Sequence, residues 1–163
     1  MILALSHARH GGRLAVTHEL EDGRALVFEL LDEPPPGALA AARVELDPER
    51  AWLARLDRVD FPPGGVAYRH VHPGPGIRYL ASGELTLERE GGARAYRAGE
   101  AWFEDADDPV TATAGPEGAA FLRLLLLPAE WAGKRTIRYL DPADEAKPKL
   151  QRATILREEP LRL

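Results

Sequence analysis

Residues Gly64 to Gly83 have the sequence GGVAYRHVHPGPGIRYLASG, in which two closely spaced histidines precede a loop rich in Pro and Gly. His70 and His72 lie one residue apart in a strand-like run, and alternate residues of an extended strand point to the same side. Both imidazoles can therefore reach one point, and neutral imidazole is a common ligand of divalent transition metals. A loop rich in Pro and Gly follows, and a second strand-like run ends at Ser82-Gly83. The stretch predicts two strands joined by a loop, with two histidines on one face.

Composition limits the class of protein. A chain of 163 residues suits one domain, and its net charge of −5 argues against a nucleic-acid partner. The longest apolar run, Leu124 to Leu127, is too short to cross a bilayer, and the start lacks the cationic region of a secretion signal. There is no cysteine, so His, Asp, Glu or water would have to hold any metal. We expect a cytoplasmic protein without a membrane or nucleic-acid partner.

Short strands separated by turns dominate the chain. Two strand-like runs within residues 13–31 flank Glu21-Asp22-Gly23, and a second hairpin surrounds Gly91-Gly92. The apolar run at residues 119–128 is typical of a strand buried on both faces. Asp47-Pro48 favours a short helix start, and residues 134–140 and 150–156 are candidate late strands. The pattern predicts an all-β sandwich or barrel.

The histidine stretch resembles the first motif of the cupin family. That motif is Gly, five residues, His, one residue, His, three or four residues, Glu, six residues and Gly. Gly64, His70, His72 and Gly83 stand in register here, and Gly76 stands at the Glu position. The resemblance implies a double-sheet jelly-roll barrel.

The second cupin motif is mostly lost. It begins at Gly99-Glu100, but Val110 stands at its His position and Ala114 at its Asn position. The resemblance covers about residues 56–128. We therefore expect one cupin domain over residues 1–163, with N-terminal strands within 13–31 and a C-terminal extension at 129–163.

The resemblance also implies a divalent metal, because three His and one Glu converge on an ion in cupins of this type. Gly76 and Val110 cannot ligate, which leaves His70 and His72 as candidate ligands and Glu104 as a substitute carboxylate. Zn, Fe, Mn or Ni would suit such a site. The alternative is that no metal binds and the histidines are polar residues of a pocket. Further substitutes, considered less favourably, are Asp105, Asp107, Asp108, His7, His10 and His18.

Four residues are candidates for a pocket inside the barrel. Arg78 shares strand parity with Gly76, and a buried guanidinium needs an internal carboxylate or a carboxylate-bearing ligand. Tyr68 shares parity with His70, Trp102 is a core or rim aromatic, and Val110 stands at the lost His position. Simple core packing is the alternative for both aromatic residues.

Three functions remain open from the sequence. The first is a small-molecule-binding cupin with a two-His metal site as an option. The second is a metal-dependent dioxygenase or isomerase acting on a small polar or carboxylate substrate. The third is a non-catalytic sensor or structural dimer. No residue is assigned a catalytic role, and the resemblance implies a homodimer.

Overall fold

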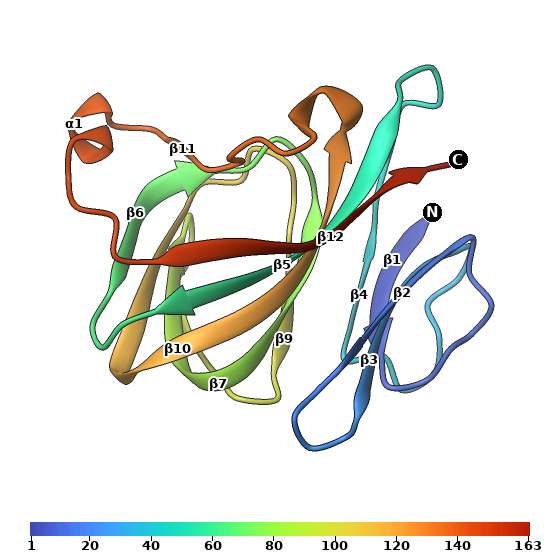
Figure 1. Cartoon of the computed structure of the whole chain (residues 1–163), viewed down its shortest axis with the longest axis horizontal. Helices are drawn as coiled ribbons and strands as arrows, with labels where there is room; N and C mark the ends of the chain where they lie inside the picture. The colour runs from blue at the N-terminus through green and yellow to red at the C-terminus, as the bar shows by residue number, and fades with distance from the viewer.

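The structure is a computed structural model that describes all 163 residues. It is almost entirely β, as predicted, and consists of an open jelly roll with a smaller sheet beside it (Figure 1). Only one short α-helix and one 3₁₀ turn interrupt the strands. The elements are β1 (Ile2–Ser6), β2 (Leu14–Glu19), β3 (Ala25–Leu31), β4 (Ala40–Arg43), β5 (Trp52–Phe61), β6 (Val66–Val71), β7 (Gly76–Arg89), β8 (Gly92–Arg97), β9 (Ala101–Glu104), β10 (Val110–Pro128), η1 (Ala129–Trp131), β11 (Arg138–Tyr139), α1 (Pro142–Glu145) and β12 (Arg152–Leu161).

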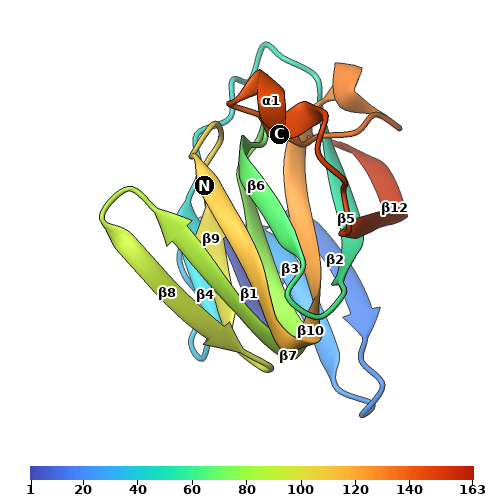
Figure 2. The same ribbon diagram turned by 90° about the vertical axis from the view of Figure 1, so that its left-hand side faces the viewer.

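The jelly roll is one eight-stranded sheet that curls around its own interior. Its order is β11-β6-β10-β5-β12, and β7 pairs with β10, β8 and β9. The long strand β10 joins the two halves, because its first part pairs with β6 and its last part with β5 (Figure 2). Both faces of residues 119–128 are buried, which confirms the prediction for this apolar run.

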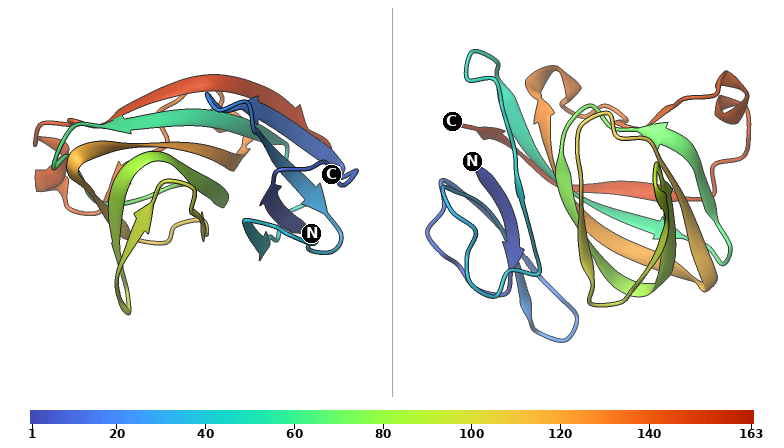
Figure 3. Two further views of the ribbon diagram at one scale, coloured as in Figure 1. Left: turned by 90° about the horizontal axis from the view of Figure 1, so that it is seen from below. Right: turned by 180° about the vertical axis from the view of Figure 1, so that it is seen from behind.

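The N-terminal strands form a separate four-stranded sheet in the order β2-β3-β1-β4. This sheet packs against the outer face of the jelly roll, and residues of both sheets share one apolar cluster (Figure 3). The predicted hairpin of β2 and β3 is present, whereas β1 was not anticipated from the sequence. Strand β1 is buried along its whole length and provides the centre of this sheet.

The predicted helix start at Asp47-Pro48 is wrong. The Asp47 carboxylate accepts a hydrogen bond from the Glu49 backbone N–H, which closes a turn. Strand β5 begins at Trp52, and its residues pair with β10 along their whole length. This pairing and the burial of most β5 side chains outweigh the weak helix signal.

Side-chain alternation separates the two faces of the jelly roll. Along β7, Ile77 and Tyr79 join the cluster beneath the N-terminal sheet, whereas Arg78 and Leu80 face the opposite way. A second apolar cluster, which includes Leu80, fills much of the jelly-roll interior. The remaining interior space is the cavity described below.

The C-terminal extension returns across the jelly roll. Strand β12 pairs with β5 at the edge of the large sheet, and β11 pairs with β6. Between η1 and β11 the chain runs over one end of the barrel (Figure 1). The chain has no helix of the length and apolar character that a membrane span requires.

The first prediction concerns Gly83, where β7 and β10 approach closely. Its φ is +76°, and a Cβ there would lie 2.1 Å from the Gly118 carbonyl oxygen. Gly91 has a similar φ of +95° but open space around it, so it is a matched control. Gly91→Ala should cost only the conformational penalty of about 1 kcal/mol. Gly83→Ala should add an overpacking cost and lose at least about 3 kcal/mol in urea denaturation. Equal losses would show that the two strands are not in close contact here.

Candidate functional site: a charged cavity inside the barrel

The candidate site is a cavity of about 430 Å³ between the barrel and the C-terminal extension. Six of the residues singled out in the sequence line it: His70, His72, Arg78, Trp102, Glu104 and Val110. Ten further lining residues belong to the extension, which therefore forms one wall of the cavity.

The polarity of the cavity changes along β5. Its inward-facing residues are, in order, Arg55, Asp57, Val59 and Phe61, so the wall passes from charged to apolar along the strand. Strand β10 follows the same gradient, since Arg123 pairs opposite Asp57 and Phe121 opposite Val59. One end of the cavity is thus ionic and the other is apolar.

His70 presents one free ring nitrogen. Its Nδ1 lies 2.7 Å from the Tyr68 carbonyl oxygen, which can only accept, so Nδ1 carries the proton. Nε2 is then unprotonated, and no group of the chain bonds to it. Burial lowers the pKa of His70 below 6.5, although the bond to Tyr68 and the charge of Glu104 oppose this effect. His70 is therefore a neutral acceptor at neutral pH.

His72 is held by a guanidinium. Its Nε2 lies 3.1 Å from Arg123 Nη1, and because a guanidinium only donates, Nε2 is the acceptor. The proton then lies on Nδ1. Burial, followed by the positive charge of Arg123, lowers the pKa of His72 well below 6.5. The two imidazole rings are arranged edge to face, with their centres 5.0 Å apart.

Arg78 pairs with the carboxylate that was considered as a substitute metal ligand. Its Nη2 lies 2.8 Å from Glu104 Oε2, and Trp102 Nε1 donates to Glu104 Oε1 over 2.7 Å. Burial would raise the pKa of Glu104, but Arg78 and the bond from Trp102 hold it below 4.5. Burial lowers the pKa of Arg78 to about 10, so the guanidinium remains charged. Of the two partners considered for Arg78, the structure provides the internal carboxylate.

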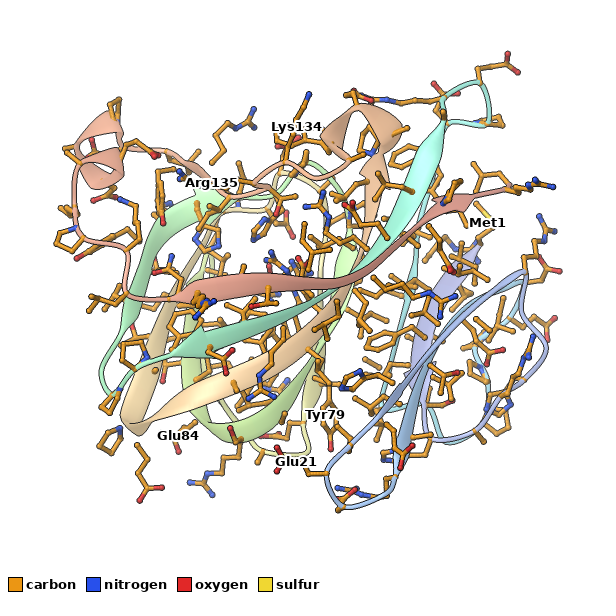
Figure 4. The ribbon with its side chains drawn as sticks, in the orientation of Figure 1. Met1, Glu21, Tyr79, Glu84, Lys134 and Arg135 are labelled. Carbon is orange, nitrogen blue, oxygen red and sulfur yellow. The ribbon has the colours of Figure 1, made fainter.

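Arg55 joins the extension to the barrel. It donates to the backbone carbonyls of Trp131 and Lys134, and its Nε lies 2.5 Å from Glu158 Oε1 on β12. The loop anchored in this way carries Lys134 and Arg135, which lie at the barrel end seen at the top of Figure 4. Both are exposed and both line the cavity, so they form its cationic rim together with Lys149.

Tyr68 does not line the cavity. Strand β6 has one more residue than β10 between the pairs His70–Val110 and Ala67–Ala112, which is a β-bulge. The bulge reverses the strand parity, so Ala67 lines the cavity together with His70. The Tyr68 ring instead lies 4.5 Å from Lys147 Nζ.

The other substitute ligands also lie outside the cavity lining. None of Asp105, Asp107, Asp108, His7, His10 and His18 lines it. Asp107 forms an exposed ion pair with Arg138. Sequence reasoning did not assign Arg55, Asp57 and Arg123 to the site. Two features of the sequence could have indicated them. Arg123 is the only charged residue in the apolar run FLRLLLLP, and Arg55 and Asp57 occupy alternate positions of the strand-like run ARLDRVDF.

The residues present do not fit a divalent metal. Nowhere in the chain do three His, Asp or Glu side chains gather around a point that could hold an ion. The His72 Nε2 lone pair accepts from Arg123, and Arg78 and Trp102 already bind Glu104. The buried guanidiniums of Arg78 and Arg123 in the same lining would also repel a cation.

Residues 57–121 match the family model of the cupin domain. The chain therefore contains a cupin domain, and the jelly roll described above is its fold. Among curated proteins, none matches the chain.

Several solved structures resemble the chain at low identity. The polyketide cyclase RemF from Streptomyces resistomycificus is 21% identical over 53% of this chain and 61% of its own, with a TM-score of 0.44. An RmlC-like cupin from Shewanella frigidimarina NCIMB 400 is 17% identical over 78% of this chain and 96% of its own, with a TM-score of 0.42. An oxalate oxidase is 23% identical over 53% of this chain and 46% of its own, with a TM-score of 0.44.

The second prediction is a loss of stability in mild acid. Below pH 6.5 the unfolded chain protonates His72, whereas the folded chain holds it neutral, so the unfolded state binds more protons. The free energy of unfolding should therefore fall as the pH drops from 7 to 5. His72→Gln keeps an acceptor for Arg123 and should reduce this slope by up to about 1.4 kcal/mol per pH unit.

Denaturant titrations at several pH values provide the measurement. The matched control is His10→Gln, at an exposed histidine outside the cavity. This variant should retain the wild-type slope. An unchanged slope in His72→Gln would show that His72 is not held neutral by the fold.

Proposed function

We propose that the protein binds a small organic anion inside the barrel without a metal ion. The main support is the excess of positive charge in the cavity lining, in a chain whose net charge is −5. The lining has six cationic side chains and two carboxylates: Arg55, Arg78, Arg123, Lys134, Arg135 and Lys149 against Asp57 and Glu104. Glu158 and Glu145 pair with two of the cations from outside the lining, and cations still remain in excess. Such an excess favours an anionic ligand.

The polarity gradient supports an amphipathic ligand. The apolar end contains Phe61 and Phe121, whose ring centres lie 6.1 Å apart, and Leu85 and Leu87 join them in the same cluster. The ionic end lies beneath the extension, close to Arg123 and the rim cations. A carboxylate with an apolar body would place its body against the phenyl rings and its charged group toward the extension. The cavity volume is within the ordinary range for small-molecule sites.

The third prediction uses matched acids and amides. Phenylacetate and hexanoate should bind at least about tenfold more tightly than phenylacetamide and hexanamide, which is about 1.4 kcal/mol. Acetate, which lacks the apolar body, should bind more weakly than hexanoate. Isothermal titration at low ionic strength measures these affinities. Equal binding of acid and amide would contradict the proposal.

Rim variants locate the anion. Lys134→Gln should weaken phenylacetate binding several-fold, because it removes a cation from the lining without removing an ion pair. Arg152→Gln is the matched control, since Arg152 is an exposed cation of the same extension that forms no ion pair and lies outside the lining. An equal loss in both variants would place the anion outside this cavity.

A second candidate function rests on the free Nε2 of His70. A neutral imidazole with one nitrogen fixed as a donor can act as a general base toward a bound molecule. The corresponding activity is that of an isomerase, in which His70 removes a proton from the bound anion and returns it. Deuterium uptake at the carbon beside the carboxylate of a bound acid, followed by NMR, measures it. His70→Gln should abolish this uptake and retain binding, and uptake at the wild-type rate in that variant would exclude His70 as the base.

A further inference from the structure

Arg123 is held in the cavity by side chains from three parts of the chain. It is 6% exposed and projects from β10 into the ionic end. Its Nε and Nη2 lie 3.0 and 2.9 Å from Asp57 Oδ2, and Nη2 also lies 3.4 Å from Thr136 Oγ1. Its Nη1 donates to His72 Nε2 over 3.1 Å. Asp57 of β5, His72 directly after β6 and Thr136 of the extension thus hold one guanidinium from three sides.

The hydrogen bond from Arg123 occupies the lone pair of His72 Nε2, which a metal ion would need as a ligand. A neutral imidazole has one nitrogen lone pair, and a ligated ion and a hydrogen-bond donor compete for it. Arginine remains protonated at neutral pH, so its guanidinium stays a donor and a cation. The donor therefore cannot convert to an acceptor and release the lone pair.

We propose that Arg123 is the resident cation of this cavity and that it takes the place of the metal ion. The guanidinium occupies His72 Nε2 and supplies the positive charge that a ligand anion would face. Nη1 has two N–H groups and His72 accepts from one, so the second remains for a ligand. The metal exclusion is independent of the proposed function, whereas the role toward an anion rests on it.

A missing third imidazole is the competing explanation for metal exclusion. Val110 lines the cavity and pairs opposite His70 on β10, so Val110→His adds an imidazole beside the two histidines. If the missing ligand alone prevents binding, this single change should create a Zn²⁺ site. If Arg123 prevents it, the guanidinium must also be removed.

Zinc titration of four proteins separates the two explanations. They are the wild type, Val110→His, the charge-balanced pair Asp57→Asn with Arg123→Met, and the triple variant that combines all three changes. The pair removes the guanidinium and its carboxylate together, so no buried charge remains unpaired. The triple variant should bind Zn²⁺ on the order of 100-fold more tightly than Val110→His alone. Equal affinity of these two, or stoichiometric Zn²⁺ in the wild type, would overturn the proposal.

A measurement on the unmodified chain does not depend on the folding of any variant. The ¹⁵N chemical shifts of the His72 ring should report an unprotonated, hydrogen-bonded Nε2 and a protonated Nδ1. One equivalent of Zn²⁺ should leave them unchanged. A saturable change in the chemical shift of His72 Nε2 would show that Zn²⁺ displaces Arg123 from this nitrogen, and it would overturn the proposal.

Carboxylate binding is tested separately from metal exclusion. Arg123→Met with Asp57→Asn should weaken phenylacetate binding at least tenfold in the absence of metal. If the wild type excludes Zn²⁺ and binds no carboxylate, the proposed function fails and Arg123 retains its role toward the metal. If the pair binds phenylacetate as tightly as the wild type, the role of Arg123 toward an anion is wrong.

Discussion

A guanidinium buried in a barrel requires a carboxylate beside it, and this requirement organises the interior of the protein. Arg78 pairs with Glu104 across β7 and β9, Arg123 with Asp57 across β10 and β5, and Arg55 with Glu158 across β5 and β12. Arg123 and Asp57 lie directly opposite in the strand register, as do Arg55 and Glu158. Each pair therefore connects neighbouring strands, and loss of one partner would leave a buried charge at a cost of about 3–5 kcal/mol. The interior depends on these pairs in addition to its apolar cluster.

The same pairs determine what the cavity can do. Glu104 is occupied by the ion pair with Arg78 and the bond from Trp102, and the lone pair of His72 by Arg123. Of the three donors expected for a metal, only His70 Nε2 therefore remains without a partner. The C-terminal extension completes the site, because Arg55 anchors its loop and the loop brings Lys134 and Arg135 to the rim. The result is a cavity with a fixed positive charge at one end and phenyl rings at the other. Within a common fold, the suitability of the cavity for a metal ion thus depends on a few interior side chains.

The sequence supported the fold more fully than the site. Motif spacing and turn chemistry were sufficient for the jelly roll, because glycines and alternating apolar residues specify strands locally. Tyr68 was misplaced because a β-bulge in β6 reverses its parity, and the spacing of the motif does not reveal a bulge. Arg123 and Asp57 are 66 positions apart, and only the register of β10 and β5 brings them together. The contribution of the extension to the cavity could not be predicted either, because tertiary contacts place its residues in the lining and no sequence motif marks them.

A crystal structure grown with Zn²⁺, with anomalous diffraction collected at the zinc absorption edge, would test directly whether Arg123 excludes a metal ion from the cavity. We expect no anomalous peak between His70 and His72, and we expect the Arg123 guanidinium within hydrogen-bond distance of His72 Nε2. We also expect Glu104 to remain paired with Arg78. An anomalous peak within about 2.1 Å of both imidazoles, with Arg123 turned away from His72, would contradict this expectation.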